Sequence, residues 1–511
     1  MNSSLDFLDK KTVLRYLVIF AVILVAGAIG KDSVALLITA VFIVNVFLNR
    51  FFESIELWLI WFFSFGFFTG QGYISSDIIS RYIAKPSFLL LVIFIYFYSR
   101  IPFKFKTAKF NFLWTVFLFL SLLSLWFHDK SLFVLITISS FFLIYLLVRA
   151  KGITKANCGK LLNLFIAVAI LQTLVSILQV AQVISAPTKI MDDGSGGQFE
   201  WVAGLDDVSS GTFGPVTAHI VSWYASLIAL FCLLVWARCR KRKYLVVVVI
   251  ALFQFATVDS KTIMAVMIIM MLYLLYYLNK NKLKFRLNSK KMVSIIVYGA
   301  LIGVGLFQCL NLYYQYQNKA GGVSTRGSLS DVYTGEVQTS QNVVLDNIGD
   351  WGKIQGFRYV YNDFIKEDPF EVILGYSLLG YSFNGKMGMI ERKDTPIMQL
   401  NNFTRSRSSL ITHFAQSGVA GFTLLLSTLF VWSRYNKKRG QLNEIDLVVN
   451  ALLKIFLPFT LFAAFIYDIS ITAPAVIGFA ALIGVLKRYA DLPMRVVVES
   501  QTTENLVANE V

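Results

Sequence analysis

Hydrophobic residues in this chain form long runs that short polar stretches separate. A helix needs about 20 apolar residues to cross about 30 Å of hydrocarbon, and most of these runs have about that length. The pattern predicts an all-α, polytopic integral membrane protein with about fourteen transmembrane helices, or about 12–14 because some runs are short. The runs are Val13–Gly30, Val34–Leu48, Leu57–Phe68, Phe88–Tyr98, Phe110–Phe127, Leu132–Val148, Leu161–Ile184, Pro215–Ala237, Tyr244–Thr257, Thr262–Leu278, Met292–Leu310, Leu410–Trp432, Leu447–Tyr467 and Ile471–Leu486.

The composition agrees with a membrane protein and excludes several other classes. Of the 511 residues, 56% are hydrophobic and 15% are charged, and the mean hydropathy is +0.64. Soluble proteins have about 45–50% apolar and about 25% charged residues, and one soluble core stops growing near ~250–300 residues. A disordered chain, a secreted disulfide scaffold and a soluble enzyme are therefore excluded. The 4 cysteines form no CxxC pair, so neither a disulfide framework nor a zinc site is expected.

The net charge of +17 is large for so apolar a chain, and its distribution along the chain explains it. If the N-terminus lies inside and fourteen spans follow, the inside loops carry 31 Lys and Arg against 10 Asp and Glu, and the outside loops carry 16 against 20. This is the excess of positive charge that marks cytoplasmic loops. It predicts cytoplasmic N- and C-termini and accounts for the charge without nucleic acid. Lys10, Lys11 and Arg15 also resemble the start of a cleaved leader, but the second apolar run after Lys31 favours an uncleaved hairpin.

Two long polar segments interrupt the order of spans, and both fall on the outer side. Trp351–Glu367, in the second segment, has apolar residues at helical spacing, and Pro369 follows as a stop signal, which together predict a helix there. The expected organisation is seven helices over 1–185, an external loop over 186–214, helices eight to eleven over 215–310, a large external loop over 311–407 between helices 11 and 12, the last three helices over 408–486, and a cytoplasmic tail over 487–511.

Among the cations that lie outside or at the outer membrane edge, against the general distribution of charge, the main ones are Lys261, Arg358, Arg405 and Arg407. Arg forms bidentate pairs with phosphate oxygens and Lys acts as a point charge, so a pyrophosphate is a suitable ligand for such a set. Each residue also has an ordinary interpretation. Lys261 fits a short external turn whose side chain reaches water, and the arginines fit exposed surface charges.

Acidic residues and histidines provide secondary candidates. Glu200, Asp206 and Asp207 lie in the first external loop and are candidate general bases, although simple solvated polarity is the plainer interpretation. His219 and His413 lie in apolar helical stretches, where a packing role competes with catalysis. No nucleotide-binding, metalloprotease, serine hydrolase or Rossmann motif is found, and the chain has 3 histidines, so neither a metal nor a cofactor is expected.

At these residues the chain resembles the O-antigen polymerase and O-antigen ligase superfamily of bacterial membrane glycosyltransferases. The resemblance rests on four short signatures in the same order, covering about Leu161–Leu486, whereas the first ~150 residues match only as hydrophobic spans. The signatures are Gly211-Thr212-Phe213-Gly214-Pro215 before a helix, Thr257–Thr262 with Lys261 where Arg is usual, Arg358 followed by Pro369, Gly375 and Gly380, and Gly418-Val419-Ala420-Gly421 within a helix.

The chain departs from the family at one position. The family often has a histidine eleven residues before the first glycine of the last signature, and here that position is Arg407. Arginine cannot accept a proton because it is always charged, so the family's proposed base does not carry over. His413 lies five residues before Gly418 and does not match the pattern.

The resemblance implies a helical fold of the lipid-sugar-using (GT-C-like) glycosyltransferase type in the bacterial cytoplasmic (inner) membrane. The expected function is an enzyme that polymerises undecaprenyl-pyrophosphate-linked oligosaccharide repeat units of a surface polysaccharide (O-antigen, capsule or exopolysaccharide) at the outer face. Catalysis would be metal-independent, with Arg358, Arg407 and Lys261 stabilising the pyrophosphate leaving group, and with Arg405 and His219 behind them. Besides the lipid bilayer and the lipid-linked donor, a chain-length regulator and a flippase are expected partners.

Two other functions stay open at this point, besides a structural membrane scaffold. An O-antigen ligase, which passes finished polymer to lipid A-core or to protein, belongs to the same superfamily, and the absence of histidine at 407 favours a polymerase. A lipid-linked oligosaccharide flippase or another transporter has a similar number of spans. Transporters usually have related halves and charges at the bilayer midplane, and neither is visible in this sequence.

Overall fold

The structure is a computed structural model that describes a helical bundle. The described residues are 6–69, 86–98, 100, 116, 133–180, 183–184, 189–192, 198–201, 211–213, 218–257, 263, 266–267, 269–274, 373, 409–433, 444–466 and 474–492.

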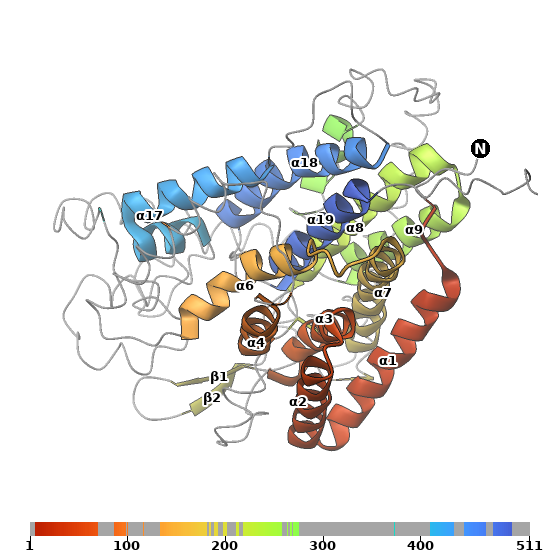
Figure 1. The fold of residues 1–511 in the computed structure, drawn as a ribbon. Coiled ribbons are helices and arrows are strands. Elements are labelled where there is room, and N and C mark those ends of the chain that lie inside the picture. The colour runs from red at the N-terminus through yellow and green to blue at the C-terminus, as the bar shows by residue number, and fades with distance from the viewer. Residues whose placement is uncertain are drawn as a thin grey trace, which may run out of the picture.

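Eleven of the expected apolar runs form helices in this part of the chain (Figure 1). Of the other three, Phe110–Phe127 has only Val116 described, Thr262–Leu278 is helical at its described positions, and Met292–Leu310 lies outside the described residues, as does the helix expected over Trp351–Glu367. The helices are α1 Lys10–Ile29, α2 Lys31–Phe47, α3 Phe51–Thr69, α4 Pro86–Tyr98, α6 Phe133–Leu147, α7 Lys155–Val180, α8 Ala218–Cys239, α9 Arg242–Thr257, α17 Ser409–Ser433, α18 Glu444–Ile466 and α19 Pro474–Asp491.

Local sequence accounts for several helix ends. Asp9 caps α1, because its carboxylate accepts hydrogen bonds from the backbone N–H groups of Lys11 and Thr12 at 3.3 and 3.1 Å. Pro86 and Pro474 open α4 and α19, where a missing N–H costs nothing and the fixed φ suits the first turn. α19 continues to Asp491, so the first residues assigned to the cytoplasmic tail belong to this helix.

Outside the helices, the described chain contains one small β-hairpin in the first long loop. β1 (Lys189–Asp192) pairs antiparallel with β2 (Gln198–Trp201), and the register places Ile190 opposite Glu200. Apart from this hairpin, the regular structure of the described residues is helical.

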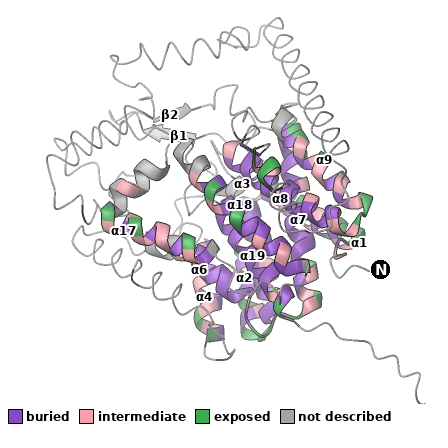
Figure 2. Ribbon diagram, turned by 90° about the horizontal axis from the view of Figure 1, so that it is seen from above, coloured by how far each residue is buried: buried purple, intermediate pink, exposed green. Residues whose placement is uncertain are grey.

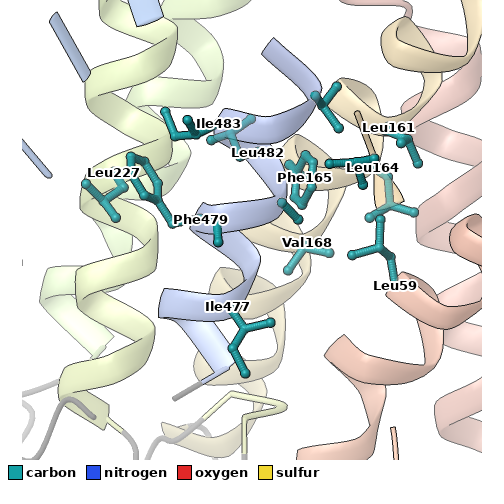
Figure 3. Packing of buried hydrophobic residues seen from close by; sticks show 14 of the residues in the cluster. Leu59, Leu161, Leu164, Phe165, Val168, Leu227, Ile477, Phe479, Leu482 and Ile483 are labelled. Atoms are coloured by element: carbon teal, nitrogen blue, oxygen red, sulfur yellow. The ribbon is translucent and has the colours of Figure 1, made fainter. Parts of the chain in front are cut away.

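The centre of the bundle is formed by α7, α8 and α19, in which buried residues dominate (Figure 2). Phe479 and Ile483 on α19 pack between Leu227 on α8 and Phe165 on α7 (Figure 3). Glycines on α19 allow close helix contact, because a Cβ atom at Gly484 would lie 2.4 Å from Val148 Cγ2. Small residues of this kind let helix backbones approach closely in membrane bundles.

Three helical segments in the described part are long and apolar enough to cross a membrane: Lys10–Ile29, Lys155–Gln179 and His219–Cys239. They differ in burial. In the apolar 18-residue stretch of each helix, 17% of the residues are buried in α1, compared with 78% in α7 and 89% in α8. α1 therefore lies at the margin of the bundle (Figure 1), with Leu14, Val18 and Val22 exposed as they would be toward lipid.

Candidate functional site

The first three residues of the first signature, Gly211–Phe213, form a buried turn against the last turns of α7. The backbone N–H of Gly211 donates to Gln179 Oε1 at 2.9 Å, and Gln179 Nε2 donates back to the Gly211 carbonyl at 3.1 Å. One position later, the Thr212 N–H donates to Gln172 Oε1 at 2.8 Å, and Gln172 Nε2 donates to Thr212 Oγ1 at 2.6 Å. Two glutamine amides of one helix thus bind two consecutive residues of the turn.

Two further contacts complete the turn. The Thr212 hydroxyl donates to the Phe63 carbonyl of α3 at 2.7 Å. The ring of Phe213 packs between those of Phe63 and Tyr224, with centroid distances of 6.0 and 5.6 Å. Gly211 has φ of +58°, and a Cβ atom there would lie 2.1 Å from Gln172 Oε1, so no other residue fits without displacing the glutamine.

The C-terminal half of α7 also binds α9. Gln254 Nε2 of α9 donates to Ser176 Oγ at 2.8 Å. The Thr173 hydroxyl shares its one hydrogen between the Ala169 carbonyl of α7 at 3.1 Å and the Ile250 carbonyl of α9 at 3.3 Å. These groups are buried, so the hydrogen bonds offset the cost of keeping amides and hydroxyls in an apolar core. We call the end of the bundle that contains these contacts and the Gly211–Phe213 turn the turn end.

The last signature gives α17 a break. Gly418 has φ of 60° and ψ of −173°, a conformation essentially confined to glycine, and it divides the helix into a segment before it and an apolar segment after it. The glycines with positive φ in the described chain are Gly211 and Gly418. Both belong to signatures that carry the resemblance stated above, and both need glycine for a reason visible in the backbone.

Charged side chains gather at the opposite end of the bundle, where α1, α7 and α9 begin and α6, α8 and α19 end; we call this the charged end. Asp6 pairs there with Lys241 and with Lys243, the latter at 2.6 Å. Burial by itself would raise the pKa of the Asp6 carboxyl, but the hydrogen bonds and charges of the two lysines outweigh it and hold the pKa below its ordinary value.

The N-terminal segment is attached at the charged end by backbone contacts as well. The N–H groups of Phe7 and Leu8 both donate to the Tyr244 hydroxyl at 3.1 Å. Asn163 of α7 donates to the Phe7 carbonyl at 2.8 Å and accepts from the Asp9 N–H at 2.9 Å. The chain ahead of α1 is thereby packed against α7 and α9.

A second group at the charged end joins α6 to α19. Arg149 pairs with Asp491 at 3.5 Å, and Arg488 donates to the carbonyls of Ile153 and Lys151, both at 3.0 Å. These contacts bring the segment between α6 and α7 against the end of α19. Segments that the alternating topology assigns to the same side are therefore in contact.

The predicted site residues are described only in part. Lys261, Arg358, Arg405, Arg407, Asp206 and Asp207 lie outside the described residues. Glu200 lies in β2, and His413 lies in the segment of α17 before Gly418; for both, the backbone alone is described. His219 lies in the first turn of α8, seven positions after Thr212, with a half-buried side chain.

Sequence reasoning missed the glutamines that bind the turn. Gln172, Ser176 and Gln179 follow one another at spacings of four and three, which place them on one side of a helix. Polar residues repeated at helical spacing inside an apolar run were the available signal. Their partners could not be inferred from the sequence, because Gln172 and Thr212 are 40 positions apart.

Comparison with known proteins finds no relative: no family model, curated protein or solved structure matches this chain.

Proposed function

We propose that this protein is a membrane glycosyltransferase that polymerises lipid-pyrophosphate-linked oligosaccharide repeat units of a bacterial surface polysaccharide. The observation that carries the proposal is the coincidence of signature and conformation at Gly211 and Gly418. Each is the first glycine of one of the four signatures, and these two are also the glycines of the described chain that adopt positive φ. A glycine at positive φ is hard to replace, so these two positions support the match to the signatures.

The separation of charged and polar groups supports the proposed orientation. The ion pairs Asp6–Lys243 and Arg149–Asp491 lie at the charged end, which we assign to the cytoplasm because Lys and Arg accumulate on that side of membrane proteins. The turn end then faces the outside, where a lipid-linked oligosaccharide is presented. The Gly211–Phe213 turn lies at the turn end, and α9 ends there at Thr257, four positions before Lys261 in the sequence.

In the proposed reaction an acceptor hydroxyl attacks the anomeric carbon of the donor sugar. The new C–O bond forms as the bond to the pyrophosphate oxygen breaks, the lipid pyrophosphate leaves with the electron pair, and the acceptor's proton passes to water or to one of the candidate bases. Negative charge develops on the departing phosphate, so cations held in place beforehand accelerate the step. Lys261, Arg358 and Arg407 are the proposed donor-binding cations, with Arg405 beside them, and Glu200, Asp206, Asp207, His219 and His413 are the secondary candidates.

The test begins with deletion of the gene and examination of the surface glycan. Loss of long chains with retention of single repeat units supports a polymerase. Full-length polymer left on the lipid pyrophosphate identifies a ligase instead, and repeat units trapped at the cytoplasmic face identify a flippase. An unchanged glycan contradicts all three functions.

Complementation with variants then tests the cations. We expect Arg358→Ala and Arg407→Ala each to reduce polymer by about 10²–10³-fold, because removing one preorganised charge-stabilising donor costs about that much in rate. Lys437→Ala, in a basic loop that we assign to the cytoplasm, is the matched control and should complement fully. Wild-type chain length in both arginine variants, at equal protein level, would refute the site.

A further inference from the structure

One side of α7 is polar although the helix lies at the centre of the bundle. Gln172, Thr173, Ser176 and Gln179 lie within two turns of its outer half, and each is at most 2% exposed. Buried amides and hydroxyls are costly unless they are hydrogen-bonded, and those that persist in membrane-spanning segments are usually functional. We call these four residues the polar face of α7.

The polar face holds two different segments at once. Gln172 and Gln179 bind the backbone of Gly211 and Thr212, ahead of α8, through paired donor and acceptor contacts of 2.6–3.1 Å. Thr173 and Ser176 bind α9 through the Ile250 carbonyl and the Gln254 side chain. Apolar packing alone would hold these helices together, but it would not set the register of the turn, because it has no preferred direction.

Along the sequence, one segment precedes the proposed donor-binding residue Lys261 and the other precedes the secondary candidate His219. Gln254 precedes Lys261 by seven positions, and Thr212 precedes His219 by seven positions. We infer that the polar face of α7 positions parts of the site for the transfer reaction. Gln172 and Gln179 are the positioning residues, and they set the distance between the start of α8 and the C-terminal end of α9. The catalytic consequence of this inference rests on the proposed function. The hydrogen bonds of Gln172 and Gln179 with Gly211 and Thr212, which we call the clasp, can be tested without activity.

Amide hydrogen exchange tests the clasp on the purified full chain. The Gly211 and Thr212 N–H groups donate to the two glutamines, so a peptide that spans them should be protected in the wild type. Gln172→Leu and Gln179→Leu keep the side-chain size but remove the acceptors, and exchange should become about tenfold faster or more. Leu178→Ala, beside Gln179 on the exposed side of α7, is the control and should leave the peptide protected. Unchanged protection in both glutamine variants would overturn the clasp.

Kinetics test the positioning role. With lipid-linked repeat units as substrate, Gln172→Leu should lower kcat by about 10²-fold and leave KM within about twofold, because a displacement of about 1 Å costs that much when binding itself is intact. A purely structural role predicts loss of folded protein with normal kcat per folded molecule, and that result would overturn the inference.

A second pair of variants guards against misfolding. Thr212→Ser retains the hydroxyl that accepts from Gln172 and donates to the Phe63 carbonyl, and it should keep near wild-type kcat. Thr212→Val has nearly the same shape without the hydroxyl and should behave as Gln172→Leu does. Equal activity of the two variants overturns the positioning role. An unchanged polymer in the deletion strain would refute the proposed function and the positioning role together. Faster amide exchange in the glutamine variants would still support the clasp in that case.

Discussion

The ammonium group of Lys487, near the end of α19, donates a hydrogen bond to the Tyr145 hydroxyl of α6 at 3.0 Å, across a sequence separation of 342 residues. Arg149 donates to the same hydroxyl, also at 3.0 Å, so one phenol accepts from two cations. The ammonium also lies 5.3 Å from the ring centroid of Tyr145 and 5.7 Å from that of Trp432. Aromatic faces and a hydroxyl therefore stabilise a lysine that is only 8% exposed.

We expect Tyr145→Phe to destabilise the protein by about 1–3 kcal/mol, because it removes the acceptor of the buried Lys487 ammonium and of the half-buried Arg149 guanidinium. In a Lys487→Met background the same substitution should cost less, since one of the two donors is absent. A double-mutant cycle on thermal unfolding in detergent measures the difference. Strictly additive effects would show that the two side chains are not coupled.

Gly418 provides a prediction about backbone conformation. Gly418→Ala places a Cβ in a region of φ and ψ that only glycine adopts readily, and we expect a loss of about 1–3 kcal/mol in stability or a straightened α17. Gly159→Ala is the control, since a Cβ there meets nothing within 4 Å and alanine favours the helix. Equal melting temperatures for Gly418→Ala and the wild type, with α17 still broken, would contradict the assignment.

The pairing of Asp6 makes the N-terminal attachment sensitive to acid. The pKa of this carboxyl is lower in the folded protein than its ordinary value of 3.8, so its contribution to stability is present above that value and is lost as the pH falls through the lowered pKa. Proteolysis of the N-terminal segment should therefore accelerate below about pH 4 in the wild type. The Asp6→Asn variant should be cleaved faster at neutral pH, and its cleavage rate should change less with acid. Because Asp9 titrates in both proteins, the difference between their pH profiles reports on Asp6 alone. An identical pH profile for the two proteins would rule out the role.

Cysteine labelling tests the assignment of the two ends. In a background without native cysteines, Ser33→Cys, at the junction of α1 and α2, should react with an impermeant maleimide on intact cells. Lys151→Cys, at the charged end, should react only after the membrane is permeabilised. The reverse labelling pattern would show that the topology is inverted and that the turn end faces the cytoplasm.

Much of the fold can be predicted from this sequence because the helices follow from local composition. Apolar runs such as Leu161–Ile184 and Pro215–Ala237 became α7 and α8 with shifts of a few residues at their ends. The ends shifted because caps, polar flanking residues and neighbouring helices extend a helix beyond its apolar part, as Lys487–Asp491 extends α19. The β-hairpin was not predicted, since its two strands have 4 residues each and no alternating pattern long enough to read.

Two of the four signatures have first glycines in the described residues, whereas the contacts made by the turn at Gly211 were not predictable. Gly211 and Gly418 were singled out within short signatures, and both have conformations that require glycine. The glutamines of α7 were passed over, because a polar residue in an apolar run is informative only when its partner is known. Lys261, Arg358 and Arg407 stay predictions, as they lie outside the described residues.

The sequence by itself determined where the helices lie and which of their ends carry charge, because hydrophobic length and the cost of burying charge depend on composition that can be read locally. Only the tertiary structure decided that Gln172 meets Thr212, that Asp6 meets Lys243, and that Lys487 lies against Tyr145. Hydrogen bonds and ion pairs depend on distances of about 3 Å and on direction. Those distances are set by the packing of helices that are far apart in the sequence, and this packing cannot be inferred from local sequence patterns.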